Sequence, residues 1–355
     1  MNAPTEQWLR DLVAKSTGAP APGAVTRLAG HASSRSYWRV VTGRANRAVC
    51  RGSVVVMVLP PDAPSDEISK GGMPLGLVPF VEIQRYLARI GVRVPELIAW
   101  SQGEGYAVLE DLGDTMLVTA ANGAARTAAY RDAVDQLARM RVRADAAPDP
   151  DCVAFRRRYD VDLYTRELGH FLDYGLGAAK GIALPGSEHE TVTQQFLATA
   201  TQLAGEHPGF THRDYQARNV MVLTGGEQAV IDFQDALLGP RVYDLVSLLR
   251  DSYVELDPRL IEDLIRRYLA ATVALGGPRL AEAEFRRVFD LVTVQRKLKD
   301  AGRFVYLDRV KGNPDFLRFV PVALRYVREA FARLPELRDT QRILGQYIPE
   351  LRTDF

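Results

Sequence analysis

Short apolar runs bounded by turn residues make up most of the first 110 positions. β-Branched and aromatic residues dominate these runs, which is typical of β-strands. Two other segments carry apolar residues at three- and four-residue steps, which is typical of helices. The pattern predicts strands at Val25–Leu28, Tyr37–Val41, Ser53–Leu59, Leu97–Trp100 and Tyr106–Leu109, and helices at Thr5–Lys15 and Pro79–Ile90.

Beyond residue 120 the helical period dominates, with one strand-rich interruption near 210–235. Because a small sheet with few helices is marginal alone, the first part should pack on this helical remainder. We therefore predict an α+β fold, with residues 1–110 and 111–355 as its two parts. The predicted helices of the second part are Ala124–Arg143, Thr191–Ala204, Val242–Tyr253, Arg259–Leu275, Ala281–Gly302, Asp315–Arg333 and Leu337–Gln346.

Composition narrows the class of protein. A chain of 355 residues exceeds the usual size of one core, which agrees with two parts. Its 45 basic and 44 acidic residues nearly balance, so charge gives no reason to expect nucleic acid or a membrane as partner. Two cysteines cannot supply a disulfide framework, and no stretch reaches the roughly 20 apolar residues of a membrane helix. We expect a cytoplasmic protein and a monomer.

A predicted hairpin near residue 225 brings two polar side chains together. Gly225-Gly226 is a strong turn signal between two apolar runs. If the turn is centred on these glycines, Val220 faces Ile231 and Asn219 faces Asp232. Opposite residues of a ladder have Cβ atoms about 4.5–5.5 Å apart, which suits two oxygen ligands that share one hard cation.

Asp214 lies five positions before Asn219, in the segment HRDYQARN. Phosphoryl transfer needs a carboxylate that receives the proton of the attacking hydroxyl, and oxygen ligands that hold Mg²⁺ against the nucleotide phosphates. Asp214 would be the base, Asn219 and Asp232 the metal ligands, and His212 a brace of the loop. Each residue taken singly is more often part of a polar turn, but the ordered combination favours a kinase.

Several stretches together resemble the kinase-like small-molecule phosphotransferases, the superfamily of aminoglycoside phosphotransferases and choline kinases. Within it, they resemble most closely the bacterial anomeric kinases of N-acetylmuramate and N-acetylglucosamine that serve cell-wall recycling. The similarity is spread over nearly the whole chain. The stretches are AGHASSRSYWRV (29–40), VVVMVLPPD (54–62), GYAVLEDLGD (105–114), THRDYQARNVMV (211–222), VIDFQDALLGPRVYDLVSLLRD (230–251) and QRKLKDAGRFVYL (295–307).

This resemblance implies a bilobal protein-kinase-like fold, with a small β-rich lobe over residues 1–110 and a larger helical lobe over 111–355. It implies ATP as phosphoryl donor, Mg²⁺ as cofactor and an amino sugar as acceptor. By the same resemblance, Asp244 would support the catalytic loop, and Gln216 and Asp235 would contact the acceptor.

The resemblance also implies a nucleotide site between the two parts. The turn that contains Ser33, Ser34 and Arg35 would cover the phosphates. It has a single glycine, so hydroxyls and backbone N–H groups would replace a Gly-rich loop. Glu110 and Leu112 stand where the family has the inter-lobe hinge, whose backbone would bind adenine.

Two departures from protein kinases keep alternatives open. The strand SVVVMVL contains no lysine to grip the phosphates, so Arg35 would supply that charge, and Gln216 stands where protein kinases often have lysine. The first alternative is a kinase of another acceptor, such as an aminoglycoside, an amino alcohol or a different hexose. The second is a catalytically silent nucleotide-binding module, which the retained Asp214, Asn219 and Asp232 argue against.

Overall fold

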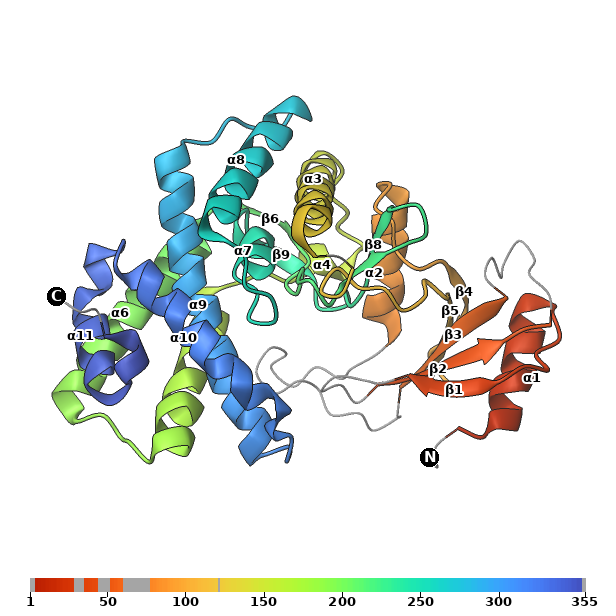
Figure 1. The fold of residues 1–355 in the computed structure, drawn as a ribbon, viewed down its shortest axis with the longest axis horizontal. Coiled ribbons are helices and arrows are strands. Elements are labelled where there is room, and N and C mark those ends of the chain that lie inside the picture. Colours follow the sequence, from red (N-terminus) through yellow and green to blue (C-terminus); the bar gives the residue numbers. More distant parts are fainter. Residues whose placement is uncertain (1–3, 29–34, 44–51, 60–76, 121, 353–355) are drawn as a thin grey trace.

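A sheet stands at one end of the computed structural model and helices fill the rest (Figure 1). The structure describes residues 4–28, 35–43, 52–59, 77–120 and 122–352. The antiparallel strands stand in the order β1-β2-β3-β5-β4. They are β1 (Val25–Leu28), β2 (Ser36–Val41), β3 (Ser53–Val58), β4 (Leu97–Ser101) and β5 (Tyr106–Glu110).

The sheet buries both of its faces, because its side chains alternate between two cores. On one face, Val54, Val56 and Val108 pack against α1 (Glu6–Thr17), whose own apolar side is fully covered. On the other face, Met57 and Leu109 join the main core, to which α2 (Leu77–Arg89) also contributes. The sheet is thereby sandwiched between α1 and the helical part.

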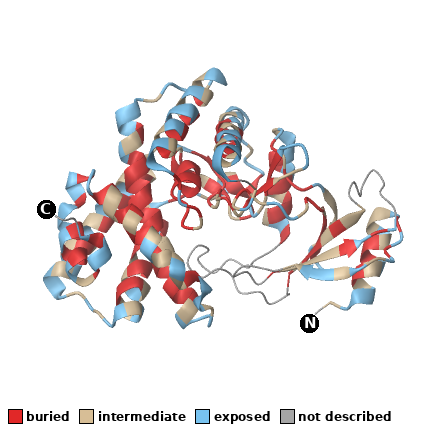
Figure 2. Ribbon diagram, in the orientation of Figure 1, coloured by how far each residue is buried: buried red, intermediate tan, exposed pale blue. Residues whose placement is uncertain are grey.

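Helix α9 (Glu282–Arg309) is the centre of the larger part. It is buried along much of its length (Figure 2) and packs against α5, α6, α7, α10 and two short helical segments. The remaining helical segments are α3 (Gly123–Ala146), α4 (Val153–Arg156), α5 (Val161–His170), η1 (Phe171–Ala178, a π-helix), α6 (Gly186–Gly205), α7 (Tyr243–Leu249), α8 (Pro258–Ala274), η2 (Pro314–Phe319), α10 (Val320–Phe331), η3 (Pro335–Leu337), α11 (Arg338–Tyr347) and η4 (Pro349–Leu351).

The predicted strands of the first part and most predicted helices are confirmed, most of them with ends that move by a few residues. The helix predicted over Ala281–Gly302 continues to Arg309. Three other elements differ. The helix predicted from Val242 to Tyr253 ends at Leu249, and the one predicted over Asp315–Arg333 divides into η2 and α10. The prediction also missed α5 with the π-helix that continues it.

The hairpin register predicted from the two glycines is wrong by one residue. Strand β7 (Val220–Val222) pairs with β8 (Gln228–Val230) so that Val220 faces Val230. Leu223 N–H donates to the carbonyl of Glu227, which leaves a three-residue loop instead of two. Beside this hairpin, β6 (Pro208–Thr211) pairs with β9 (Leu237–Pro240).

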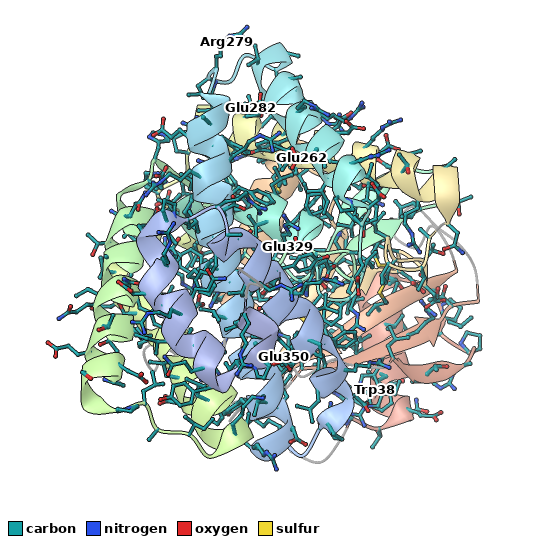
Figure 3. All side chains as sticks on the ribbon, turned by 60° about the vertical axis from the view of Figure 1, so that its left-hand side comes forward. Trp38, Glu262, Arg279, Glu282, Glu329 and Glu350 are labelled. Atoms are coloured by element: carbon teal, nitrogen blue, oxygen red, sulfur yellow. The ribbon has the colours of Figure 1, made fainter. Side chains whose placement is uncertain are left out.

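Exposed charges gather where α8 and α9 approach each other at the outer tip of the molecule. Figure 3 labels Glu262, Arg279 and Glu282 there. Arg286 pairs with both Glu262 and Glu282 and so links the two helices. No helix of the described residues combines the length and apolarity that a membrane span requires.

A close backbone approach in the centre of the molecule generates a test of packing. A Cβ on Gly302 of α9 would lie 2.9 Å from the Cα of Phe171, in the π-helix. We expect Gly302→Ala to lower the free energy of unfolding by about 1–3 kcal/mol, since backbone must move. Gly169→Ala on α5 is the matched control, because a Cβ there meets nothing within 4 Å. Chemical denaturation should give that control about 0.5–1 kcal/mol of added stability; equal effects would contradict this packing account.

Candidate active site

Two loops meet beside the β7–β8 hairpin and bring three of the predicted side chains together. Asn219 donates through Nδ2 to the carbonyl oxygen of Asp214, over 2.9 Å. The same nitrogen lies 3.5 Å from Oδ2 of Asp232. The β7–β8 hairpin therefore places a carboxylate and an amide side by side, as the sequence predicts, but not through the predicted register.

The two groups meet because the backbone makes a left-handed bend at Asp232. The last rung of the ladder joins Ile231 N–H to the carbonyl of Asn219, over 3.0 Å. In a regular strand, the side chain of Asp232 would point to the face opposite that of Asn219. Asp232 instead has φ of +64°, which turns its carboxylate back toward Asn219. This backbone conformation offsets the one-residue error in the predicted register.

Arg213, the residue before Asp214, also has a left-handed backbone, with φ of +78°. Together with Asp232 it completes the set of non-glycine residues with positive φ in the described part of the chain. Such a residue costs roughly 1–3 kcal/mol unless its surroundings fix it. Arg213 directly precedes Asp214, and Asp232 is itself one of the three converging residues. The backbone strain of the described chain is therefore concentrated at this site.

Asp244, in the first turn of α7, fixes the loop that contains Arg213. Its two carboxylate oxygens accept the backbone N–H groups of His212 and Arg213, over 2.7 and 2.9 Å. These bonds satisfy two buried donors that a left-handed bend would otherwise leave unpaired. Asp244 thus makes the contacts that a supporting role in this loop requires.

His212 lies fully buried beneath the same loop. Its Nε2 donates to the carbonyl of Ile231 over 3.0 Å, while Nδ1 accepts the N–H of Asp214 over 3.2 Å. Only the neutral imidazole can do both. Burial lowers the pKa of His212, which agrees with this tautomer. The ring ties the loop of Asp214 to the strand that leads into Asp232.

The side chain of Asp214 forms an ion pair with a buried arginine of α9. Nη2 of Arg296 lies 3.0 Å from Oδ1 of Asp214, and its Nη1 donates to the carbonyl of Arg213 over 2.7 Å. Desolvation opposes the charged form of Asp214, but Arg296, then Lys299 and Arg213, outweigh it and lower its pKa to about 2. Asp214 therefore stays ionised near neutral pH and is a weak base, which suits a carboxylate that orients a hydroxyl more than one that removes its proton.

Asp232 lies in an electrostatically different environment. Desolvation raises the pKa of Asp232, and the negative charge of Asp214 adds to this rise. A hydrogen bond from Gln234 (2.8 Å) and the charge of Arg35 oppose it. A bound cation would favour the ionised form. Because Asn219 donates its Nδ2 to the carbonyl of Asp214, the Oδ1 of Asn219 can face such a cation. The pair suits Mg²⁺, which binds few protein oxygens and keeps waters or phosphates.

A cleft of about 240 Å³ opens beside these groups. Gln216 and Asp235, the residues predicted to contact an acceptor, both line it. Its opposite wall comes from α9 and from η2, with Phe304 and Phe316 among the lining residues. The cleft thus joins the predicted catalytic and acceptor residues in one space.

Charged residues of α9 are the main part of the site that sequence reasoning missed. Arg296 and Lys297 are almost fully buried, and Lys297 pairs with Asp300 over 2.7 Å. A signal was present in the segment QRKLKD, where charges interrupt an otherwise apolar helical pattern. Because such side chains are rarely buried unless paired, a charged run in a central helix indicates internal partners.

Of the three residues predicted to bind the nucleotide phosphates, the structure describes one. Ser33 and Ser34 lie outside the described residues. Arg35 is buried at the start of β2, where it donates a hydrogen bond to the phenol of Tyr37 and its charge acts on Asp232. Arg35 is thus near Asp232, one of the predicted metal ligands, as a phosphate-binding cation would require.

The predicted hinge residues also differ from each other. The carboxylate of Glu110 pairs with Arg93, and the backbone N–H of Glu110 donates to the carbonyl of Glu96. That N–H is therefore occupied. Leu112 packs with Met221 and Ala229 in a small apolar cluster, and its N–H has no hydrogen bond with the described residues.

An ion-pair network ties this hinge to the sheet. Arg39 of β2 donates to Asp111 over 2.6 Å and to Asp114 over 2.9 Å. Ser53 of β3 also donates to Asp111, over 2.6 Å. Desolvation opposes ionisation of Asp111, yet the hydrogen bonds from Arg39 and Ser53 lower its pKa. The segment after β5 is thereby fixed to strands β2 and β3.

Trp38, labelled on the sheet in Figure 3, contacts the core on the α1 side of the sheet and also Arg27, so it serves packing.

The sheet, the two loops and the helical remainder define a bilobal protein-kinase-like fold. The sequence matches the family described as "Phosphotransferase enzyme family" over residues 24–283, and the chain belongs to that family. It is therefore a phosphotransferase with a hydroxyl acceptor. Solved structures of similar fold include choline kinase LicA from Streptococcus pneumoniae, with a TM-score of 0.62, 12% identity and coverage of 91% of this chain and 99% of that one. The ADP-bound aminoglycoside phosphotransferase APH(2'')-Ib has a TM-score of 0.58, 16% identity and coverage of 92% and 99%.

Relatives at higher identity carry one common name. The N-acetylmuramate/N-acetylglucosamine kinase of Neisseria meningitidis serogroup B is 31% identical over 339 residues, which cover 93% of both chains. The kinase of the same name from Pseudomonas aeruginosa is 32% identical, over 94% of this chain and 91% of its own. The family resemblance expected from the sequence motifs is thereby confirmed.

The opposite pKa shifts of the two aspartates give a test by pH. As pH falls, Asp232 takes up its proton first, because its pKa is raised, while Asp214 stays charged until near pH 2. If Asp232 binds Mg²⁺, the ion and the proton compete for it, and we then expect more free Mg²⁺ to move the acidic fall of kcat/KM for ATP to lower pH. Initial rates across pH at low and saturating Mg²⁺ measure this shift. A midpoint that does not depend on Mg²⁺ would contradict it, provided that circular dichroism shows a folded protein throughout.

Proposed function

We propose that this protein is an ATP-dependent kinase of the anomeric hydroxyl of N-acetylmuramate, N-acetylglucosamine or both, which yields a sugar 1-phosphate. The observation that carries the proposal is the convergence of Asp214, Asn219 and Asp232 at one cleft. The choice of sugar rests on relatives of that name, which align over more than nine-tenths of the chain.

For the nucleotide, we propose that Asn219 and Asp232 hold Mg²⁺ against the phosphates, and that Arg35 supplies the charge that the lysine-free strand lacks. The turn with Ser33 and Ser34 would cover the phosphates. The apolar cluster around Leu112 would form one wall of the adenine site, with the Leu112 N–H as donor. When bound, the cation would neutralise the charge that develops on the phosphates.

At the acceptor, Asp214 receives the hydrogen bond of the attacking hydroxyl and aligns its oxygen. A pKa of about 2 makes Asp214 a poor base in the ground state. Phosphoryl transfer with a loose transition state asks for little proton removal at that stage. An anomeric hydroxyl, which is more acidic than other sugar hydroxyls, further reduces the demand. Asp214 thus acts chiefly by orientation.

The charge of the cleft favours this acceptor over two alternatives. Six cations line it, namely Arg213, Arg218, Arg296, Lys297, Lys299 and Arg303, against five carboxylates, one of which, Asp232, would be neutralised by the bound metal. Aminoglycosides and choline are cationic and would be repelled by this surplus. A neutral or anionic sugar would not. A silent nucleotide-binding module is disfavoured because the proposed catalytic and metal-binding residues, Asp214, Asn219 and Asp232, are all present and line one cleft.

The choice of the anomeric position can be tested with blocked sugars. We expect N-acetylmuramate and N-acetylglucosamine to support ADP release, and their methyl glycosides to be inert because they lack a free C1 hydroxyl. Coupled ADP release measures the rates, and ³¹P–¹H coupling identifies the phosphorylated carbon. Equal rates with the methyl glycosides would refute phosphorylation at C1 while leaving a sugar kinase.

Two substitutions separate the proposed roles of the carboxylates. Asp214→Ala should lower kcat by about 10²–10⁴ with little change in Mg·ATP binding, because Asp214 would meet the acceptor and is not one of the proposed metal ligands. Asp232→Asn should instead weaken Mg·ATP binding, as seen by calorimetry. Asp263→Asn, on the exposed face of α8, is the control and should leave both quantities unchanged. A folded Asp214→Ala enzyme with normal turnover would exclude the proposed role.

A further inference from the structure

The acceptor side of the cleft carries more positive charge than its own acidic groups neutralise. Apart from Asp232 on the metal side, the lining carboxylates are Glu167, Asp214, Asp235 and Asp300, against six lining cations. Glu167 pairs with Arg213, over 2.8 Å. Asp214 pairs with Arg296, and Asp300 pairs with Lys297 and Lys299 on its own helix.

Arg218 differs from these paired cations. In the described part of the chain, no carboxylate lies within ion-pair distance of it, and it makes no hydrogen bond there. Its guanidinium carbon instead lies 3.6 Å from the ring centroid of Tyr253 and 5.4 Å from that of Phe319. Stacking restrains the planar group and leaves its N–H edge available for a planar acid.

The direction of the side chain separates Arg218 from the phosphate-binding region. Its neighbour Asn219 contacts Asp232 on the metal side. Arg218 turns the other way, onto Tyr253 beyond α7 and Phe319 of η2, while still lining the cleft. A cation at that position faces the acceptor and not the nucleotide.

We propose that Arg218 binds a carboxylate of the acceptor, namely the lactyl carboxylate of N-acetylmuramate. This inference rests on the proposed function. N-Acetylmuramate differs from N-acetylglucosamine only by a lactyl ether at O3, so its acid is the one added charge. A stacked guanidinium offers two parallel N–H donors to such a group. Arg218 is half-exposed, so it stays solvated beside Tyr253 when the acceptor lacks the acid, and both sugars are accepted.

Neutralising the acid in the sugar and the cation in the protein tests this contact. The acceptors are N-acetylmuramate, its neutral lactyl amide and N-acetylglucosamine, each measured as kcat/KM by coupled ADP release. For the unaltered enzyme we expect the acid to exceed the amide by about 10- to 100-fold, the range for a charge-assisted hydrogen bond. In Arg218→Gln the ratio of acid to amide should approach one. Arg218→Lys should recover part of it, since charge returns without the planar fork.

Arg318→Gln is the matched control. Arg318 also stacks on Phe319, at 4.9 Å, but is exposed and does not line the cleft. We expect its acid-to-amide ratio to equal that of the unaltered enzyme. If Arg218→Gln instead lowers kcat/KM equally for all three acceptors, or if the unaltered enzyme treats acid and amide alike, the inference is overturned.

Failure of the proposed function would be recognised separately. If the unaltered protein phosphorylates neither sugar, calorimetry with N-acetylmuramate and N-acetylglucosamine still reads the contact. Weaker binding of the acid alone in Arg218→Gln would support a carboxylate site without kinase activity. Identical binding of the acid by both proteins would overturn it. Arg218→Lys serves in the same comparison if Arg218→Gln does not fold.

Discussion

The active site depends on two left-handed residues, Arg213 and Asp232, and on the hydrogen bonds that fix them. Asp244 accepts the backbone N–H groups of His212 and Arg213 at one bend, and the ladder rung between Ile231 and Asn219 precedes the other. Without the first bend, Asp214 would lose its position beside Arg296. Without the second, Asp232 would point away from Asn219. Strain at functional residues persists where the surroundings determine it fully, and here buried backbone bonds do so.

Helix α9 adds an electrostatic constraint to this geometry. Burial of Arg296 is tolerated because Asp214, the carbonyl of Arg213 and the phenol of Tyr243 all accept its donors. One consequence is chemical, since the same contact that satisfies the arginine weakens Asp214 as a base. The site therefore combines Asp214, an ionised carboxylate held by an ion pair, with Asp232, a carboxylate whose pKa is raised. The two proposed roles, orientation of the acceptor by Asp214 and metal binding by Asp232, would thus have different electrostatic environments.

Much of the fold follows from local pattern, because strands and amphipathic helices express their period directly in the sequence. The motif HRDYQARN likewise indicates Asp214 and Asn219. The hairpin register did not follow, since two glycines fit a two-residue loop and a three-residue loop equally well. Nor did the bend at Asp232, because aspartate adopts the left-handed region more often than most residues but still only in a minority of cases. The ion pair between Asp214 and Arg296 joins positions 82 residues apart, so only the tertiary structure creates it.

The clamp of Arg39 on Asp111 and Asp114 bears on how the two parts of the molecule are joined. With Ser53 it binds the segment after β5 to the adjacent strands β2 and β3. Leu112 lies inside that segment and packs on Met221 and Ala229 of the β7–β8 hairpin. One short stretch is thereby anchored by charge to the sheet and by apolar contact to the hairpin that leads into Asn219 and Asp232, so loosening the Arg39 clamp would also loosen the support of that hairpin.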